Sequence, residues 1–194
     1  MSFEEYVIKN NLGTIENGVR FAELTTIGCG GKIRTLYTPK NLEALLQAFQ
    51  YIEKHELSFF LLGNGSNVLA SDREYTGIVI QLKKLPYSYS IEDNILTCSA
   101  FYPTSKLAYD LALEEWGDLS FLGGIPGLLG GAINNNSGAY KEDIQKHLID
   151  VTYINSAGKK ITIPNKDCAF GYRKSIFHYI DGIIISARFK VKKD

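Results

Sequence analysis

Glycine and asparagine are concentrated in one stretch of this chain, in a pattern that suits direct contact between a backbone and a ligand. Seven of the 18 glycines fall within Gly117–Gly138, and three consecutive asparagines, Asn134–Asn136, stand near its end. Glycine has no Cβ to obstruct a ligand or a positive φ angle, and asparagine supplies amide donors and tolerates left-handed backbone. The alternative is an irregular surface loop with several tight turns. The apolar Phe121–Leu122 at the head of the glycine run favours a binding site.

A second glycine cluster, Gly63–Asn67, follows the apolar run Phe59–Leu62. Successive backbone N–H groups in such a turn form a nest that binds anions, and Ser66 and Asn67 add neutral donors. The cluster could therefore hold a pyrophosphate without any lysine, although a plain hairpin turn explains it equally well. It does not match the dinucleotide-binding fingerprint, because the third glycine position is occupied by Val68.

One arginine, Arg173, stands between aromatic residues in the segment Phe170–Phe177. A guanidinium in this setting has the chemistry to face a carboxylate or an enolate oxygen. The other explanation is a solvated arginine whose aliphatic stem packs on Tyr172. The residue types alone favour the second explanation.

Cysteines and histidines give no support for a nucleophile or a metal site. Cys29, in the glycine-containing segment Thr25–Gly31, has no histidine or basic neighbour in sequence to activate it, so we expect a small packed residue. His55, His147 and His178 stand apart and have no ligand partner at helical or hairpin spacing. We therefore expect no metal.

Two amphipathic segments predict helices. Asn41–Glu56 repeats apolar residues at helical spacing behind an N-cap asparagine, and Pro103–Trp116 starts on a proline and stops before Gly117. Hairpin turns are predicted at Glu92–Asn94 and Ser156–Lys159. Short runs rich in Ile, Val, Phe and Tyr predict strands at Ser58–Leu62, Gly77–Leu82, Leu96–Ala100, Leu148–Asn155, Lys160–Pro164 and Gly182–Val191.

The composition is that of a globular protein of one domain or of two small lobes. The 194 residues include 45% hydrophobic and 22% charged ones, and 21 basic residues balance 21 acidic ones. A zero net charge argues against nucleic-acid binding, which needs an excess of cations. Three scattered cysteines and the lack of a long apolar run predict a cytoplasmic protein without a membrane segment. We expect an α+β fold without regular βαβ alternation, joined around Leu82–Ser90.

Four motifs, taken in order, resemble the FAD-binding region of the UDP-N-acetylenolpyruvoylglucosamine reductase (MurB) family of peptidoglycan precursor synthesis. They are Thr25–Gly31, Leu62–Leu69, Gly124–Tyr140 and Phe170–Phe177. The first departs from the family pattern, with Gly28 at the family's arginine position and Lys32 at its proline position. The resemblance implies the two-lobed FAD-binding fold of MurB and of vanillyl-alcohol-oxidase-like flavoproteins, with one FAD-binding lobe at 1–85 and a second at 86–194.

The same resemblance implies two sets of FAD-binding residues and one catalytic residue. Arg173 matches the family's arginine that acts on the substrate enolate. The first FAD-binding set is Gly63, Asn64, Gly65, Ser66 and Asn67. The second set is Gly124, Ile125, Pro126, Gly127, Gly130, Gly131, Asn134, Gly138, Ala139 and Tyr140.

The chemistry that the resemblance implies is an oxidoreduction. NADPH delivers a hydride to FAD, the flavin passes it to the enolpyruvyl double bond of a UDP-sugar, and a serine protonates the resulting enolate. The family's proton-donor serine motif and its later glutamate have no match here. The C-terminal substrate-binding domain is likewise expected to be missing after the strand that ends at Val191.

Three functions remain open from the sequence. The first is a UDP-N-acetylmuramate dehydrogenase-type flavoprotein that a second chain completes. The second is a catalytically incomplete, stand-alone FAD-binding module used for binding or electron transfer. The third, less favoured, is an oxidase of the wider flavoprotein superfamily.

Overall fold

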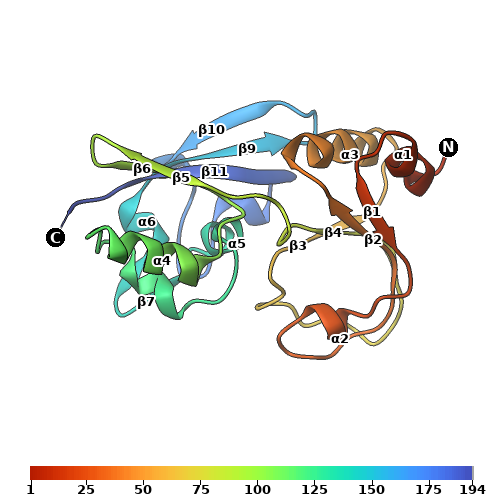
Figure 1. Cartoon of the computed structure of the whole chain (residues 1–194), viewed down its shortest axis with the longest axis horizontal. Coiled ribbons are helices and arrows are strands. Elements are labelled where there is room, and N and C mark those ends of the chain that lie inside the picture. Colours follow the sequence, from red (N-terminus) through yellow and green to blue (C-terminus); the bar gives the residue numbers. More distant parts are fainter. Residues whose placement is uncertain (194) are drawn as a thin grey trace. The chain divides into compact units, whose positions relative to one another are not determined.

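The computed structural model describes residues 1–193 (Figure 1). Two compact units emerge from the contacts within the chain. The first is Met1–Pro86 together with the turn Ser156–Gly158, and the second comprises the other described residues from Tyr87 onward. The last residue of the predicted second lobe, Asp194, lies outside the described residues. That the two units are two ligand-binding lobes remains a prediction.

The first unit is a four-stranded sheet with two longer helices and one short one. Its strands lie in the order β1-β2-β4-β3, in which β2 and β3 run parallel to β4 and β1 runs antiparallel to β2. The sequence pattern did not predict this parallel pairing. The elements are α1 (Phe3–Lys9), β1 (Gly13–Glu16), α2 (Phe21–Leu24), β2 (Ile33–Pro39), α3 (Leu42–Lys54), β3 (Phe59–Leu62) and β4 (Tyr75–Gln81).

The predicted helix at Asn41–Glu56 is confirmed as α3. The Asn41 side chain accepts a hydrogen bond from the backbone N–H of Ala44 at 2.8 Å, a cap worth about 1 kcal/mol. The centre of the apolar face of α3 is buried in the unit at Leu45, Phe49 and Ile52, each 0% exposed. Helix α1 lies beside α3, with the rings of Tyr6 and Tyr51 stacked at 4.2 Å between centroids (Figure 1).

The second unit is a five-stranded antiparallel sheet with helices on one side. Its strand order is β10-β9-β11-β6-β5, and Figure 1 shows α4, α5 and α6 all on the same side of this sheet. The strands of this sheet are β5 (Tyr89–Glu92), β6 (Ile95–Ser99), β9 (Leu148–Asn155), β10 (Lys160–Pro164) and β11 (Gly182–Lys190), while β7 (Gly138–Ala139) and β8 (Glu142–Asp143) form a separate two-stranded sheet. The helices of the unit are α4 (Thr104–Leu113), α5 (Leu129–Asn134), α6 (Ile144–His147) and the 3₁₀ turns Ser120–Gly124, Asn165–Asp167 and Ile176–His178.

Most strand and hairpin predictions for the second unit are confirmed. The bounds of β9 and β10 are the predicted ones, and the turn at Ser156–Lys159 joins them. The other hairpin turn carries positive φ angles of 50° at Asp93 and 61° at Asn94, which these residue types tolerate. The core between the sheet and the helices contains Leu107, Leu122, Leu129, Ile133, Val151 and Phe189, among others.

The prediction for the second helix is wrong at its ends. Pro103 has extended backbone and is the N-cap, so it does not occupy the first helical turn. The helix ends at Leu113, before the predicted Trp116, because the backbone N–H of Trp116 donates back to the carbonyl of Leu111 at 2.9 Å. Glu115, with φ of 62°, reverses the chain there. Within residues 1–193, no helix has the length and apolar character that a membrane crossing requires.

Candidate functional site

The predicted anion loop Gly63–Asn67 begins directly after β3 in the first unit. Ligands of parallel sheets bind beyond the carboxyl ends of the strands, and β3 is parallel to β4. Gly65 has a φ of 68°, and a Cβ on it would lie 2.2 Å from the carbonyl oxygen of Leu24. The backbone N–H of Thr26 donates to the carbonyl oxygen of Gly65 at 3.1 Å. The loop is therefore held against the predicted motif that starts at Thr25.

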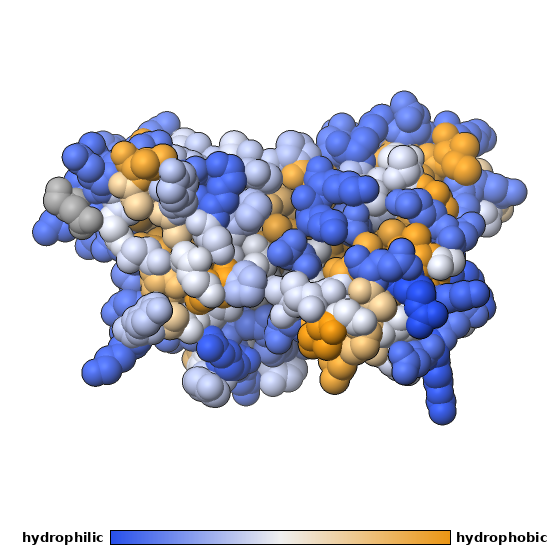
Figure 2. Space-filling view, turned by 60° about the horizontal axis from the view of Figure 1, so that its bottom comes forward, coloured by the Kyte–Doolittle hydropathy of each residue, from blue (hydrophilic) through white to orange (hydrophobic). Residues whose placement is uncertain are grey.

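Neutral polar groups and apolar side chains reach the surface around this loop. Asn64 and Asn67 are exposed, and each amide can donate two hydrogens. Ile27 and Leu69, on the two adjoining segments, are 55% and 76% exposed. Figure 2 shows that apolar residues on the face it depicts occur as separate patches among hydrophilic ones. An anion at Gly63–Asn67 would thus meet backbone and amide donors from the loop, which contains no basic residue.

In the second unit, the glycine-rich segment is hydrogen-bonded to the chain that enters α4. The N–H of Thr104 donates to the carbonyl of Gly127 at 3.0 Å, and the N–H of Gly130 donates to the carbonyl of Ala100 at 2.7 Å. The hydroxyl of the fully buried Thr104 donates to the carbonyl of Ile125 and lies 3.2 Å from that of Gly127. Sequence reasoning missed Thr104. Its position at the predicted helix start was the only signal for it.

Part of the glycine-rich segment is helical, which the sequence did not predict. Gly130, Gly131 and Asn134 lie in α5, because the burial of Leu129 and Ile133 outweighs the low helix propensity of glycine. Such a short helix is held mainly by this packing.

Two of the predicted FAD-binding glycines are not required by the fold. A Cβ placed on Gly124 or on Gly131 would meet no atom within 4 Å, and neither residue has a positive φ. In contrast, Gly127 has a φ of 142°, and a Cβ on Gly138 would lie 2.3 Å from the carbonyl of Glu142. Glycine at Gly124 and Gly131 therefore leaves open space above the backbone, which is what close approach of a ligand needs.

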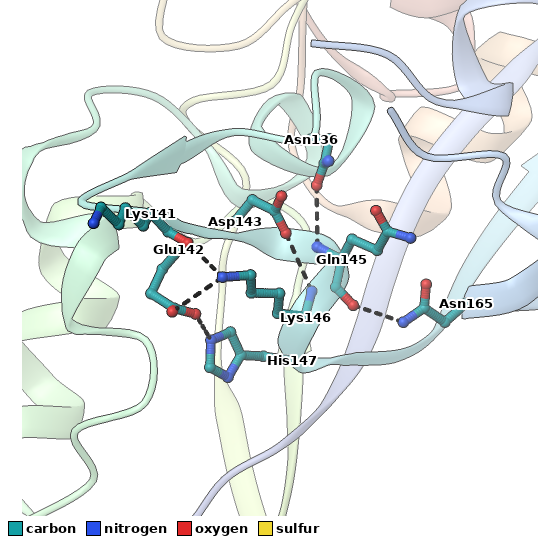
Figure 3. A network of polar contacts seen from close by, with 8 residues as sticks. All are labelled: Asn136, Lys141, Glu142, Asp143, Gln145, Lys146, His147 and Asn165. Atoms are coloured by element: carbon teal, nitrogen blue, oxygen red, sulfur yellow. Dashed lines mark hydrogen bonds and ion pairs between the residues drawn. The ribbon is translucent and has the colours of Figure 1, made fainter. Parts of the chain in front are cut away.

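The chain then forms a small hairpin, β7–β8, whose tip carries the predicted residue Tyr140. Tyr140 and Lys141 have φ angles of 55° and 69°, and Tyr140 is 89% exposed. Figure 3 shows the polar network behind the hairpin, in which Glu142 contacts both Lys146 and His147. The hydrogen bond from His147, at 2.9 Å, lowers the pKa of the Glu142 carboxyl, and Lys146 adds to this effect.

Arg173 lies at the exposed tip of a two-residue turn. The backbone groups of Gly171 and Lys174 exchange two hydrogen bonds, of 3.0 and 3.2 Å, and Arg173 has a φ of 53°. Its Nη2 donates to the carbonyl of Gly138 at 3.3 Å, and its guanidinium lies 5.5 Å from the ring centre of Tyr172. Both sequence-based explanations thus have a part: the stem is exposed beside Tyr172, and the guanidinium faces the predicted FAD-binding segment.

Two buried side chains connect this turn to the asparagine run. The Nδ2 of Asn136 donates to the carbonyl of Gly171 at 3.1 Å, and the hydroxyl of Ser175 donates to the carbonyl of Asn134 at 2.6 Å. Asn136 is 4% exposed and Ser175 is fully buried. The sequence predicted amide donors from the run Asn134–Asn136 as a whole, and it gave no separate role to Ser175. The structure therefore brings Arg173 together with Asn134, Gly138 and their neighbours in one unit, while Gly63–Asn67 belongs to the other unit.

Among residues 1–193, no group of three or more His, Cys, Asp and Glu side chains is placed to hold a metal ion. In the second unit, the potential donors of the predicted FAD-binding segment and of the Arg173 turn are backbone amides, asparagine side chains and one guanidinium. Such a set suits an organic anion with a large polar framework better than a metal.

The sequence is similar to one described protein family and to several named proteins. Residues 33–163 match the family described as FAD binding domain. The chain is 30% identical over 189 residues to the UDP-N-acetylenolpyruvoylglucosamine reductase of Bacillus pumilus, covering 97% of this chain and 62% of that protein. It is 33% identical over 169 residues to the enzyme of that name from Protochlamydia amoebophila, covering 87% of this chain and 56% of that one.

Solved structures show the same fold. The crystal structure of the reductase (MurB) from Thermus caldophilus matches with a TM-score of 0.77 and 27% identity, covering 93% of this chain and 63% of that one. A structure of alkyldihydroxyacetonephosphate synthase matches with a TM-score of 0.63 at 16% identity, which concerns the fold alone. The predicted α+β FAD-binding fold is confirmed. The chain spans about 60% of the length of the reductases it matches.

Proposed function

The chain belongs to the FAD binding domain family and is homologous to the FAD-binding part of MurB reductases, and from this premise we propose that it binds FAD. The observation that carries the proposal is the open backbone at Gly124 and Gly131, where the fold itself gives no reason for glycine. A glycine inside a helix costs about 1 kcal/mol relative to alanine, so the open position at Gly131 is explained by a ligand that would collide with a Cβ.

The chemistry of the donors fits the parts of FAD. We assign the negatively charged pyrophosphate to the loop Gly63–Asn67, whose backbone and amide groups are neutral donors. We assign the segment Gly124–Tyr140 to contact with the rest of the cofactor, through exposed backbone at its open glycines. When bound, FAD supplies the capacity to accept and transfer a hydride.

For Arg173 we propose a role toward the substrate. Its guanidinium is exposed, permanently charged and aimed at the FAD-binding segment, with a single hydrogen bond to the carbonyl of Gly138. A guanidinium so placed can exchange this neutral acceptor for an oxyanion, which it binds more strongly because the acceptor is ionised. Arg173 would thereby stabilise negative charge that develops on a substrate oxygen.

The finer proposal is an activity of the UDP-N-acetylmuramate dehydrogenase type, with NADPH as reductant and a UDP-sugar enolpyruvate as substrate, in the cytoplasm. It is supported by the relatives' names and by the position of Arg173 beside the segment 124–140. A second candidate is a FAD-binding module used for binding or electron transfer, and it is supported by the family match at residues 33–163, which concerns FAD binding alone.

One assay separates the two candidates. FAD-loaded protein is mixed with NADPH, with and without the UDP-sugar enolpyruvate, and both NADPH oxidation and product are measured. Product formed in proportion to the NADPH oxidised supports the reductase. Flavin reduction without product supports the module. A protein that takes up no FAD overturns both.

A further inference from the structure

We propose that Asn136 is a positioning residue, which holds the turn of Arg173 in place beside the FAD-binding segment. The consequence for ligand binding rests on the proposed function. The hydrogen bonds of Asn136 do not depend on that function.

The carboxamide of Asn136 connects three parts of the second unit. Its Nδ2 donates to the carbonyl of Gly171 at 3.1 Å, and its Oδ1 accepts from the backbone N–H of Gln145 at 3.0 Å. Gly171 opens the turn of Arg173, Gln145 lies in the first turn of α6, and Asn136 itself follows α5. Figure 3 shows the bond between Asn136 and Gln145. The Nδ2 and Oδ1 atoms of Asn136 thus bond to two different segments.

The local backbone fits asparagine in particular. Asn136 has a φ of 42° and is only 4% exposed. Asparagine tolerates left-handed backbone better than other residues with side chains, and its amide provides a donor and an acceptor at once. Removal of the side chain would leave the N–H of Gln145 without this partner in a partly buried place, and the carbonyl of Gly171 would keep only its bond from the N–H of Lys174.

The position of Arg173 depends on the bond between Asn136 and Gly171, because the guanidinium's own hydrogen bond, to Gly138, is weak. The Arg173 guanidinium bonds to Gly138, two residues beyond Asn136, from an exposed side chain. The exposed bond of Arg173 therefore joins the same two segments as the bond from the buried Asn136, and the bond from Ser175 to Asn134 joins them at the far end of the turn. An exposed contact of this kind is expected to contribute little. The buried amide then fixes where the guanidinium stands.

The experiment uses the whole chain and three variants. Asn136→Ala removes both bonds, and Asn136→Asp keeps the acceptor while replacing the donor by an oxygen. The matched control is Asn165→Ala, since Asn165 also makes two side-chain bonds to backbone in this unit, to the carbonyls of Gln145 and Leu148, both at 2.7 Å. The first readout is amide hydrogen exchange of residues 170–176 without FAD. The second is FAD affinity and the absorption spectrum of the bound flavin.

We expect Asn136→Ala to lower the protection of residues 170–176 about tenfold, the effect of one lost buried hydrogen bond, while Asn165→Ala leaves that segment unchanged. The flavin spectrum should shift in Asn136→Ala and not in the control Asn165→Ala. In Asn136→Asp, protection should be low at pH 8 and recover below about pH 5, where a protonated carboxyl can again donate to Gly171. The charged or titratable residues on the two segments that Asn136 contacts are Asp143, the N-cap of α6, Lys146 and His147 in α6, and Arg173 and Lys174 of the turn.

Unchanged protection in Asn136→Ala, or an equal loss in Asn165→Ala, would overturn the positioning role. So would an Asn136→Asp variant whose protection shows no dependence on pH. If the wild-type chain takes up no FAD, the proposed function fails, and the exchange readout still decides the role of Asn136 in the turn.

Discussion

The hydroxyl of Ser175 donates a hydrogen bond to the backbone carbonyl of Asn134 across 41 positions of the chain, at 2.6 Å and without exposure to solvent. Together with the bond from Asn136 to Gly171, it joins the glycine-rich segment to the turn of Arg173. Two motifs that lie far apart in the sequence thus meet, and the guanidinium of Arg173 lies beside Gly138 of the glycine-rich segment.

Gly131→Ala should stabilise the FAD-free protein and weaken FAD binding. Alanine is favoured over glycine inside a helix by about 0.8–1 kcal/mol, and its methyl group would meet no atom within 4 Å. The same methyl group would occupy the space assigned to the cofactor. Urea denaturation and a flavin titration measure the two effects. Gly130→Ala is the control, because its Cβ would lie 3.2 Å from that of Ala100 and should bring no such gain. Unchanged FAD affinity in Gly131→Ala would refute the role of this glycine.

Gly65→Ala should destabilise the first unit more than Gly28→Ala. Both glycines have left-handed backbone, with φ of 68° and 72°, so both variants carry a strain of about 1 kcal/mol. Only at Gly65 would the Cβ collide with a carbonyl oxygen, that of Leu24, while Gly28 has open space. We expect a further loss of about 2 kcal/mol at Gly65, measured by thermal unfolding. Equal losses in the two variants would show that the packing of the anion loop is not as described.

Arg173→Ala should leave FAD bound and abolish turnover. The guanidinium makes one exposed hydrogen bond, so its loss should change stability by less than about 0.5 kcal/mol. In preparations that reduce the UDP-sugar enolpyruvate, the rate should fall by about 10²-fold or more, as for other lost donors to a developing oxyanion. Arg173→Lys, which keeps the charge but not the planar fork, should retain part of the rate. Steady-state assays decide the matter, and undiminished turnover in Arg173→Ala would exclude the catalytic role.

His147→Ala should raise the pKa of Glu142 toward its ordinary value. The hydrogen bond from His147 is the main cause of the lowered pKa, and Lys146→Ala should have a smaller effect. Because the folded-state pKa is the lower one, the contribution of this carboxylate to stability is complete above the unfolded-state pKa and is lost as the pH falls through the folded-state pKa. Carboxyl NMR titration of Glu142 measures the shift. An unchanged titration in His147→Ala would contradict the contact in Figure 3.

Much of the fold could be predicted from local sequence signals. The N-cap at Asn41 and the turn residues Asp93 and Asn94 act through their own backbone, so their effects are visible in the sequence. The capping box of α1, in which Ser2 and Glu5 bond to each other's backbone, is equally local, because both residues lie within one turn of the chain. Helix α5 could not be predicted, because its propensity is poor and only contacts with distant residues stabilise it.

The residues of the candidate site likewise divide into those that local sequence reveals and those whose roles depend on distant partners. The local density of glycine predicted the two glycine clusters, and the family resemblance predicted the role of Arg173. The sequence could not distinguish a glycine required by conformation, such as Gly127, from an open one such as Gly124, because that difference lies in neighbours far along the chain. The roles of Asn136 and Ser175 were hidden for the same reason, since their partners Gly171 and Asn134 are 35 and 41 positions away.

The flavin content of the protein tests the central claim most directly. The purified chain, after incubation with FAD and removal of the excess, is denatured, and the released flavin is identified and quantified. We predict a yellow protein that releases FAD in a stoichiometric amount, with less retained by Gly131→Ala at limiting FAD. A colourless protein that takes up no added FAD, while its fold is intact by circular dichroism, would contradict the account.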